Sequence, residues 1–363
     1  MSLAYRPEID GLRAVAVLPV LLFHAGLDAF SGGFVGVDVF FVLSGYLITS
    51  IIVSEMQAGT YTLVGFYERR ARRILPALFA VMACCIVPAW VLMAPHQLKD
   101  FSQSVVAVST FASNVLFWLQ SGYFEPAAEL KPLLHTWSLA VEEQYYLVFP
   151  LMLMALRYVG WRAWKPVLTV LAFASLALAQ WSASRYPESN FYLLHTRAWE
   201  LLGGALMALQ GPRLATVAGR LAPAGAWLGL ALVLAAIVFF DRTTPFPSLW
   251  TVVPVGGTML LVTLAETGSG VGRVLASRPL VALGLVSYSL YLWHQPLLAF
   301  LRIRQGDPQL GAASIAGFMV LSLLLAAVSY RWVERPFRSR ARVPRWSIFT
   351  LSAAGILMFG MLG

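Results

Sequence analysis

The sequence predicts an all-α polytopic membrane protein, with a core of ten spanning helices and an eleventh helix that follows the core. Of its 363 residues, 59% are hydrophobic and only 12% are charged, whereas about a quarter of a soluble domain is charged. Apolar runs of about 20 residues recur from end to end, and each can cross a hydrocarbon core of roughly 30 Å. Such runs have to be helices, because lipid offers no partner to an open strand edge.

Twelve apolar windows are candidates for the spans, and the arginines between them decide which ones cross. The windows are residues 12–30, 34–53, 74–94, 102–120, 138–157, 165–183, 193–210, 224–240, 250–265, 280–302, 311–333 and 346–362. Positive loops stay on the cytoplasmic side, so Arg6 and Arg13 place the N-terminus in the cytoplasm. If window 102–120 does not cross, the later arginine-rich loops also fall inside, and only the loop with Arg302 and Arg304 falls outside. The net charge of +9 therefore fits membrane orientation and argues against a nucleic-acid partner.

A polar stripe at helical spacing indicates that window 102–120 does not cross. The stripe consists of Ser102, Gln103, Ser109, Thr110, Ser113 and Asn114. We expect this segment to be re-entrant or interfacial. The membrane domain then covers residues 1–338, and residues 339–363 form a basic linker and an additional outward helix. A chain that stops directly after this helix raises the expectation of an extracytoplasmic domain beyond it.

Ionisable residues inside the apolar runs are functional candidates, because each costs about 2.5–3.5 kcal/mol to insert near mid-membrane. They are Arg13, His24, Asp38, Glu142, Glu143, Arg197, Glu200 and His294. His24 follows Arg13 by eleven residues, a rise of roughly 16 Å along a helix. An imidazole can take a proton from a hydroxyl nucleophile, and an arginine can hold a phosphate. The alternative is a histidine that only hydrogen-bonds a neighbouring helix. Asp38 is placed where it could orient His24 and raise its basicity.

Four arginines are clustered in "YERRARRILP", at the predicted inner edge of the membrane. They are Arg69, Arg70, Arg72 and Arg73. An orientation signal needs fewer charges. The cluster would also bind a polyanionic cytoplasmic ligand such as a nucleotide or coenzyme A.

The stretch "LLHTWSLAVEEQYY" brings His135, Trp137, Ser138, Glu142 and Glu143 to the predicted outer face. We expect Ser138 to N-cap the helix that follows. The two carboxylates could do acid–base work or hold a substrate, or they could pair with an arginine such as Arg197. Arg197 could equally be neutralised by Glu200 three residues on. A serine–histidine–acid triad at Ser138 is disfavoured, because "TWSLA" lacks the glycine-flanked nucleophile turn.

The chain as a whole resembles the acyltransferase-3 family of integral membrane acyltransferases, which O-acetylate bacterial surface polysaccharides. Seven motifs occur in family order over residues 5–338: "YRPEIDGLRAVAVLPVLLFHAG", "GGFVGVDVFFVLSGYLIT", "FYERRARRILPAL", "LHTWSLAVEEQYYLVFP", "RAWELLGGAL", "GLVSYSLYLWHQPLL" and "WVERPFR". The resemblance implies a ten-span core in the bacterial cytoplasmic membrane. Many members continue past an eleventh helix into an extracytoplasmic SGNH-type domain, and no SGNH residues occur in this sequence.

The resemblance also implies roles for individual residues. His24 matches the essential histidine of the family, Arg13 its essential first-helix arginine, and Arg70 with Arg72 an R-x-R pair that engages the acyl-coenzyme A donor. We expect acetyl-coenzyme A to dock from the cytoplasm, with its phosphates held by Arg70, Arg72 and either Arg13 or Arg73, and no metal to take part.

Catalysis and the acceptor follow from the same resemblance. His24, oriented by Asp38 or Glu142, would deprotonate a sugar hydroxyl that arrives from the outer face, or would carry the acyl group itself. His135, Trp137, Ser138 and Glu143 are expected on the acceptor side. The acceptor, a polysaccharide or glycolipid, stays open between O-antigen of lipopolysaccharide, peptidoglycan, exopolysaccharide and small glycosides.

A proton-coupled transporter or flippase is the alternative function, because intramembrane His, Asp and Glu residues also form proton relays. The clustered inner arginines and the absence of an obvious repeat between the two halves count against it.

Overall fold

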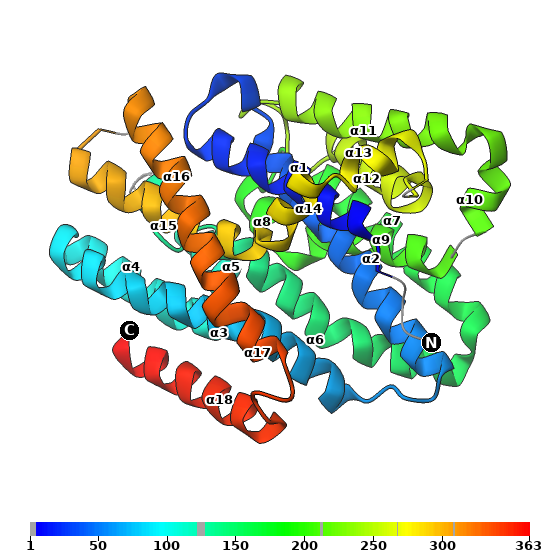
Figure 1. The fold of residues 1–363 in the computed structure, drawn as a ribbon, viewed down its shortest axis with the longest axis horizontal. Coiled ribbons are helices and arrows are strands. Elements are labelled where there is room, and N and C mark those ends of the chain that lie inside the picture. The colour runs from blue at the N-terminus through cyan, green and yellow to red at the C-terminus, as the bar shows by residue number, and fades with distance from the viewer. Residues whose placement is uncertain (1–4, 122–127, 211–212, 267, 308) are drawn as a thin grey trace. The chain divides into compact units, whose positions relative to one another are not determined.

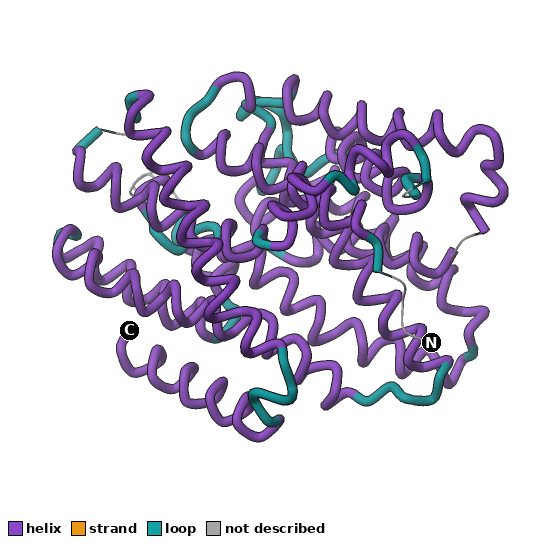
Figure 2. Tube along the Cα trace, in the orientation of Figure 1, coloured by secondary structure: helices purple, strands orange, loops and turns teal. Residues whose placement is uncertain are grey.

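The computed structural model describes residues 5–121, 128–210, 213–266, 268–307 and 309–363, and it confirms the all-α class. Within these residues the backbone is helical with short connections, and no strand occurs (Figure 2). The chain divides into two compact units, whose helices are labelled in Figure 1. The first comprises Met1–Phe23, Leu27–Tyr61 and Val141–Leu285, and the second His24–Gly26, Thr62–Ala140 and Val286–Gly363.

The helices follow the predicted apolar windows closely. The first unit contains α1 (Pro7–His24, whose last residue belongs to the second unit), α2 (Gly36–Gln57), most of α6 (Thr136–Val159), α7 (Trp164–Ser182), α8 (Pro187–Tyr192), α9 (Leu194–Gln210), α10 (Arg213–Ala218), α11 (Ala222–Phe239), α12 (Val252–Leu264), α13 (Gly270–Leu275) and α14 (Arg278–Leu285). The second contains α3 (Leu63–Leu92), α4 (Pro95–Ser109), α5 (Ser113–Leu119), α15 (Ser287–Gln305), α16 (Ala312–Ser329), α17 (Arg335–Arg338) and α18 (Arg345–Leu362).

Seven helices in the described part of the chain are long and apolar enough to cross a membrane. They are Asp28–Gln57, Leu63–Leu92, Thr136–Val159, Trp161–Ser182, Thr216–Phe239, Ala312–Arg338 and Arg345–Leu362. The protein is therefore a multi-pass membrane protein. The remaining predicted spans are shorter or more polar helices, so the total of eleven spans stays a prediction.

The segment predicted not to cross is broken into two short helices. α4 ends at Ser109 and α5 begins at Ser113, and between them Phe111 has a φ of 54°. Neither helix reaches the roughly 20 residues that a span needs. Half of the polar stripe is buried against protein, namely Ser109, Ser113 and Asn114, and Ser113 Oγ donates a hydrogen bond of 3.0 Å to the carbonyl of Thr136. Both features support a segment that does not cross.

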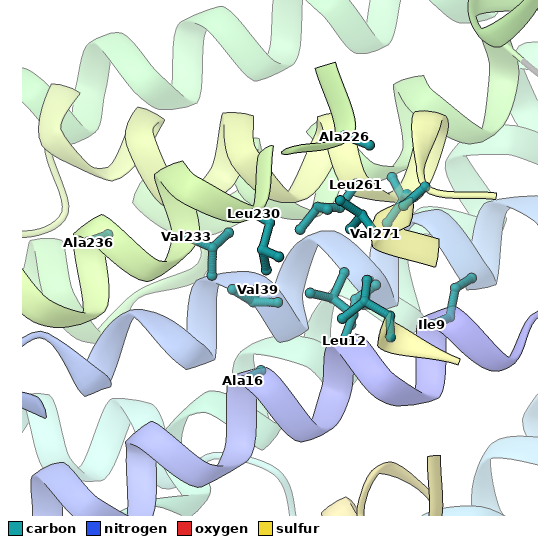
Figure 3. Close-up of a cluster of buried hydrophobic side chains, with 14 of the residues drawn as sticks. Ile9, Leu12, Ala16, Val39, Ala226, Leu230, Val233, Ala236, Leu261 and Val271 are labelled. Carbon is teal, nitrogen blue, oxygen red and sulfur yellow. The ribbon is translucent and has the colours of Figure 1, made fainter. Parts of the chain in front are cut away.

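The core of the first unit lies where α1, α2, α11, α12 and α13 meet. Figure 3 shows side chains from these helices pointing toward one another. The buried members include Ile9, Leu12, Ala16, Val39, Ala226, Leu230, Val233, Ala236, Leu261 and Val271. All are aliphatic, so the helices pack through branched and small side chains with no polar atom to satisfy.

Two glycines let α2 and α9 approach each other at backbone distance. A Cβ on Gly45 would lie 1.8 Å from the carbonyl oxygen of Leu201, and a Cβ on Gly204 would lie 2.0 Å from that of Val42. Lipid is as apolar as a leucine side chain, so helices in a membrane associate mainly through such close packing. The glycines of "SGYLI" and "ELLGGAL" are therefore required by the interface between these helices.

We predict that Gly45→Ala destabilises the protein, because the added methyl group meets a backbone carbonyl that cannot move independently. Overpacking of this kind costs about 1–3 kcal/mol, which thermal unfolding in detergent would detect as a lower midpoint. Gly256→Ala is the matched control, since a Cβ at Gly256 in α12 has nothing within 4 Å. Equal midpoints for the two variants would contradict the close-approach argument.

Candidate active site

Three imidazole rings are in contact in the second unit. The centroids of the His24 and His294 rings lie 5.2 Å apart, and those of His135 and His294 also lie 5.2 Å apart. His24 ends α1, His135 precedes α6, and His294 lies in α15. The predicted base, His24, and a predicted acceptor-side residue, His135, are thus joined through a third histidine. We call these three side chains the histidine cluster.

His294 is the site residue that the sequence analysis did not assign a role. It was named among the ionisable residues of the apolar runs, and it lies in the motif "SYSLYLWHQP". In the structure its side chain is completely buried. The sequence feature that points to His294 as a site residue is its position in an apolar run, since an intramembrane histidine is a functional candidate by default.

Tyr291 connects α15 to the segment that carries His135. Its phenol donates a 2.8 Å hydrogen bond to the carbonyl of His135, and the phenol oxygen lies 2.7 Å from Ser138 Oγ. Either hydroxyl can be the donor in the second bond, because Ser138 Oγ also lies 3.2 Å from the carbonyl of His135. The backbone carbonyl of the same tyrosine accepts a 2.5 Å bond from Nδ1 of His294.

The expected N-cap role of Ser138 is wrong. α6 begins at Thr136, so Ser138 lies within its first turn. Its hydroxyl is buried and serves Tyr291 instead. Trp137 is also buried beside it. The helix starts two residues earlier than the sequence suggested because Thr136 itself bonds the carbonyl of Leu133 and the hydroxyl of Ser113.

Arg302 fixes the backbone of His24. Its Nη2 donates a 2.6 Å hydrogen bond to the carbonyl of His24, and its Nη1 lies 3.7 Å from Oε2 of Glu129. A cation at the C-terminus of a helix also interacts favourably with the helix dipole. This arginine is only 4% exposed, so it is not the loop charge that the topology argument counted as falling outside.

His135 is uncharged near neutral pH. Its position before α6 is buried, and this burial lowers the pKa of the imidazole to about 3, with a further lowering from the nearby His24 ring. The carbonyls of Leu292 and Pro132 act in the opposite direction. The His135 ring therefore contributes an uncharged surface to the histidine cluster.

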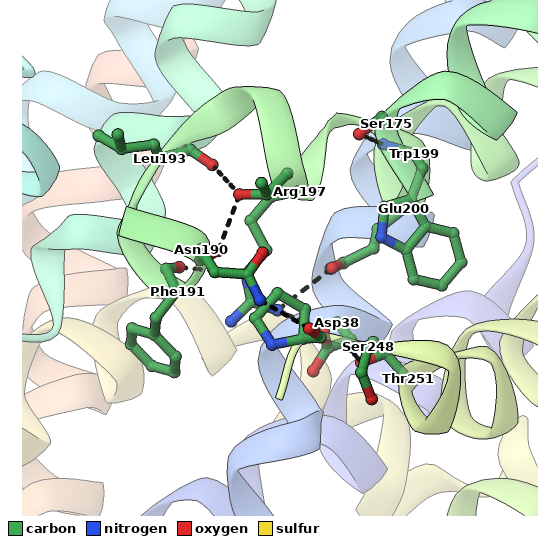
Figure 4. Close-up of polar contacts among 12 residues, drawn as sticks. Asp38, Ser175, Asn190, Phe191, Leu193, Arg197, Trp199, Glu200, Ser248 and Thr251 are labelled. Atoms are coloured by element: carbon green, nitrogen blue, oxygen red, sulfur yellow. Dashed lines mark hydrogen bonds and ion pairs between the residues drawn. The ribbon is translucent and has the colours of Figure 1, made fainter. Parts of the chain in front are cut away.

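The first unit contains a separate buried group, the ionic triad Asp38–Arg197–Glu200 (Figure 4). Nη1 of Arg197 lies 2.9 Å from Oδ1 of Asp38 and 3.2 Å from Oε1 of Glu200. The rings of Phe191 and Phe246 lie 5.0 and 5.2 Å from the guanidinium carbon. The pairing of Arg197 with Glu200 is confirmed. Asp38 is the second partner, which gives it a structural role and leaves its predicted role at His24 a prediction.

The remaining predicted residues of the first unit also have protein partners. Glu142 accepts a 2.5 Å hydrogen bond from Ser44, and Glu143 beside it is half-buried. Arg13 pairs with Asp10 at 2.7 Å, three residues earlier in α1. Arg13 and Glu142 are thus held by their own unit, and their predicted roles toward donor and base stay predictions.

The arginine cluster of α3 divides into one buried and several accessible side chains. Arg72 is 3% exposed, and its guanidinium bonds Glu68 at 2.9 Å and the carbonyl of Phe337 at 3.2 Å. Glu68 also holds Arg340 of the linker before α18, at 3.2 Å, and Arg345 at the start of α18, at 2.8 Å. Arg69, Arg70 and Arg73 are half-buried. Arg72 therefore stabilises the fold, and its three neighbours are the better candidates for holding a ligand.

Taken together, the second unit provides the groups for acyl transfer. A half-buried imidazole at the end of α1 can move a proton, and basic side chains on α3 can hold an anionic donor. Among the residues that the structure describes, no three His, Cys, Asp or Glu side chains converge as metal ligands. The candidate site thus comprises the histidine cluster and the arginine-rich helix α3.

Comparison with known proteins identifies similar sequences. The family described as acyltransferase domain matches residues 6–331. The peptidoglycan O-acetyltransferase OatA of Listeria monocytogenes is 33% identical over 93% of this chain and 56% of its own. The putative peptidoglycan O-acetyltransferase YrhL of Bacillus subtilis is 30% identical over 99% of this chain and 61% of its own. The O-acetyltransferase OatA of Staphylococcus aureus is 30% identical over 93% of this chain and 58% of its own.

The chain thus spans between 56% and 61% of the length of these relatives. No solved structure matches the chain.

We predict that Arg197→Ala destabilises the first unit, because it leaves two carboxylates buried without a counter-charge. Breaking a buried pair in this way costs about 3–5 kcal/mol, and the yield of folded protein and its thermal midpoint should both fall. Arg185→Ala is the control, since Arg185 is exposed and its guanidinium lies over the ring of Trp181. An Arg197→Ala protein as stable as this control would show that the triad contributes nothing.

Proposed function

Because the chain belongs to the acyltransferase-3 family of integral membrane proteins, we propose that it transfers an acetyl group from cytoplasmic acetyl-coenzyme A to a hydroxyl of peptidoglycan. The observation that carries this proposal is the second unit, which contains both the histidine cluster and the arginines of α3. Peptidoglycan is chosen among the open acceptors because two of the relatives are named for it. Family membership favours group transfer over the transporter alternative.

The donor is a polyanion, and we assign its phosphates to Arg70 and Arg73, with Arg69 beside them. All three guanidinium groups are half-buried on α3. Arg72 is left out of this set because Glu68 and the Phe337 carbonyl already hold it. We propose that the N-terminus and the arginine cluster lie in the cytoplasm, which the charge distribution supports, and that the protein lies in the bacterial inner membrane.

His24 is assigned the general base. Its ring nitrogen takes the proton of the acceptor hydroxyl while the hydroxyl oxygen attacks the thioester carbonyl. The carbon–sulfur bond then breaks, and the coenzyme A thiolate takes the proton from the His24 imidazolium, which restores the neutral ring. Trp137, Ser138, His135 and Glu143 are assigned to the acceptor side, and the orienting roles of Asp38 and Glu142 stay predictions.

We predict that His24→Ala abolishes acetyl transfer and leaves coenzyme A binding intact, because the imidazole moves a proton and the arginines hold the donor. Acetylated glycan is measured by mass spectrometry, and donor binding by calorimetry on the purified protein. His96→Ala is the matched control, since His96 is exposed at the start of α4. Full activity of His24→Ala would contradict the proposal that His24 is the base.

Uptake of a solute by proteoliposomes that contain the protein, in the absence of coenzyme A, would favour the transporter alternative.

We predict that Arg70→Ala and Arg73→Ala each raise the KM for acetyl-coenzyme A by about 10- to 100-fold, the value of one charge-assisted hydrogen bond of roughly 1.5–3 kcal/mol. Their thermal midpoints should stay near that of the wild type. Arg72→Ala should show the reverse pattern, with a lower midpoint, because it leaves Glu68 without its nearest partner on the helix. If Arg70 and Arg73 variants keep the wild-type KM, the donor is not held by this helix.

A further inference from the structure

The hydrogen bond of His294 determines which of its nitrogens carries the hydrogen. Nδ1 lies 2.5 Å from the carbonyl oxygen of Tyr291. A carbonyl can only accept, so Nδ1 is the donor, and in the neutral ring Nε2 has a free lone pair. This nitrogen is completely buried and has no hydrogen-bond partner among the residues that the structure describes. Buried polar atoms normally have a hydrogen-bond partner, so we expect Nε2 of His294 to accept a hydrogen bond at some point in the reaction cycle.

Two other rings of the histidine cluster touch His294 and could supply that donor. Neither ring nitrogen of His135 has a hydrogen-bond partner among the residues that the structure describes, although the backbone of Pro132 and of Leu292 acts on its ring, so His135 is the competing donor that the test has to exclude. His24 is half-buried, and its ring is tilted by 57° against that of His294 at a centroid distance of 5.2 Å. Rings at this separation are in edge contact. We infer that a rotation about the side-chain bonds of His24 directs a ring N–H at Nε2, since such bonds commonly tighten only when substrate is bound.

We propose that His294 is a positioning residue for His24: its buried Nε2 accepts a hydrogen bond from the His24 ring, which fixes the tautomer of His24 and leaves the other nitrogen as the base. The inference rests on the proposed function, in which His24 takes the acceptor's proton. His294 itself does not touch the reacting atoms. When His24 is protonated, the same bond stabilises the imidazolium without any covalent step at His294.

Both ends of this hydrogen bond are held by α15. The ring of His294 is fixed by the carbonyl of Tyr291 in the same helix, and Arg302 fixes the backbone of His24 from two turns further on. The phenol of Tyr291 anchors the helix to His135 and Ser138. One rigid helix thus sets the position of His24 and the direction of its hydrogen bond.

The surroundings leave the cluster with a single titrating step. The ionisable groups around His24 and His294 in this unit are His135 before α6, Tyr291 and Arg302 on α15, and Glu129 in the 3-10 turn Ala128–Leu130. Arg302 and Glu129 form an ion pair, and His135 stays neutral. We therefore expect a proton taken by His24 to be shared with His294, whose ring it contacts.

The test combines histidine nitrogen NMR with a pH–rate profile. The sample is full-length protein labelled with ¹⁵N-histidine in lipid nanodiscs. Because the chain has five histidines, single His→Gln variants are enough to assign each signal. The chemical shifts of the ring nitrogens then report the tautomer of each histidine. The wild type should show His294 with hydrogen on Nδ1 and His24 as one tautomer in the presence of coenzyme A. His294→Ala should give mixed His24 tautomers, and kcat should fall by about 10- to 100-fold.

The pH–rate profile supplies a readout that a merely structural role would not change. In His294→Ala the protonated His24 loses the acceptor that stabilises it, so the acid limb of the profile should move to lower pH. His294→Gln keeps a neutral amide acceptor near the position of Nε2, and it should retain one His24 tautomer with partial activity. Tyr291→Phe keeps the backbone carbonyl and should leave the His294 tautomer unchanged. His96→Ala is the control for the substitution itself.

Two results would overturn the proposal. One is a His294→Ala protein with wild-type His24 tautomer and pH profile. The other is a spectrum in which His135 alone donates to Nε2 of His294. If no form of the protein transfers acetyl groups, the proposed function fails while the NMR measurement still decides the hydrogen bond, so the two failures can be told apart.

Discussion

Inside a bilayer a charged side chain has to find its counter-charge within the protein, and this constraint explains most of the polar structure of the chain. Arg197 is satisfied by Asp38 and Glu200 in the first unit. In the second unit Glu68 gathers Arg72, Arg340 and Arg345. Each group joins segments far apart in sequence, so each stabilises tertiary structure while it pairs a buried ion. Near mid-membrane a lone ion costs about 2.5–3.5 kcal/mol on insertion scales.

The same constraint separates arginines that build the fold from arginines that are left for a ligand. Arg72 and Arg73 are neighbours in sequence, but only Arg72 faces the protein interior and meets Glu68. A guanidinium whose donors are already bound to carboxylate and carbonyl oxygens has little left for a phosphate. The other members of the cluster are half-buried on α3, where a ligand can approach them, and the donor is therefore assigned to Arg70 and Arg73.

The sequence predicts the helices well because a span of about 20 apolar residues is a local pattern. It also predicts, from the polar stripe, that window 102–120 does not cross, whereas the break at Phe111 is visible only in the structure. Partners across long distances have no such signature. Nothing in the sequence couples Arg302 to the His24 carbonyl, which is 278 positions away. The positive-inside rule therefore treats the buried Arg302 as a loop charge. Likewise, the sequence pattern indicates Ser138 as an N-cap, because the hydrogen bonds of Thr136 have no signature in the sequence. His24 and His135 were predicted as site residues, whereas His294 became one only through its contacts.

A neutral acceptor beside His24 is the solution that the constraint favours. In a histidine–aspartate pair the carboxylate stabilises the imidazolium with a full charge, and that charge would itself need burial and pairing in the membrane domain. Of the two carboxylates predicted for this role, Asp38 is bound to Arg197, and Glu142 accepts a hydrogen bond from Ser44. An imidazole whose Nδ1 is held by a backbone carbonyl presents a fixed lone pair and carries no charge at rest. It can therefore orient a catalytic histidine in a site where a second ion would be too costly to bury.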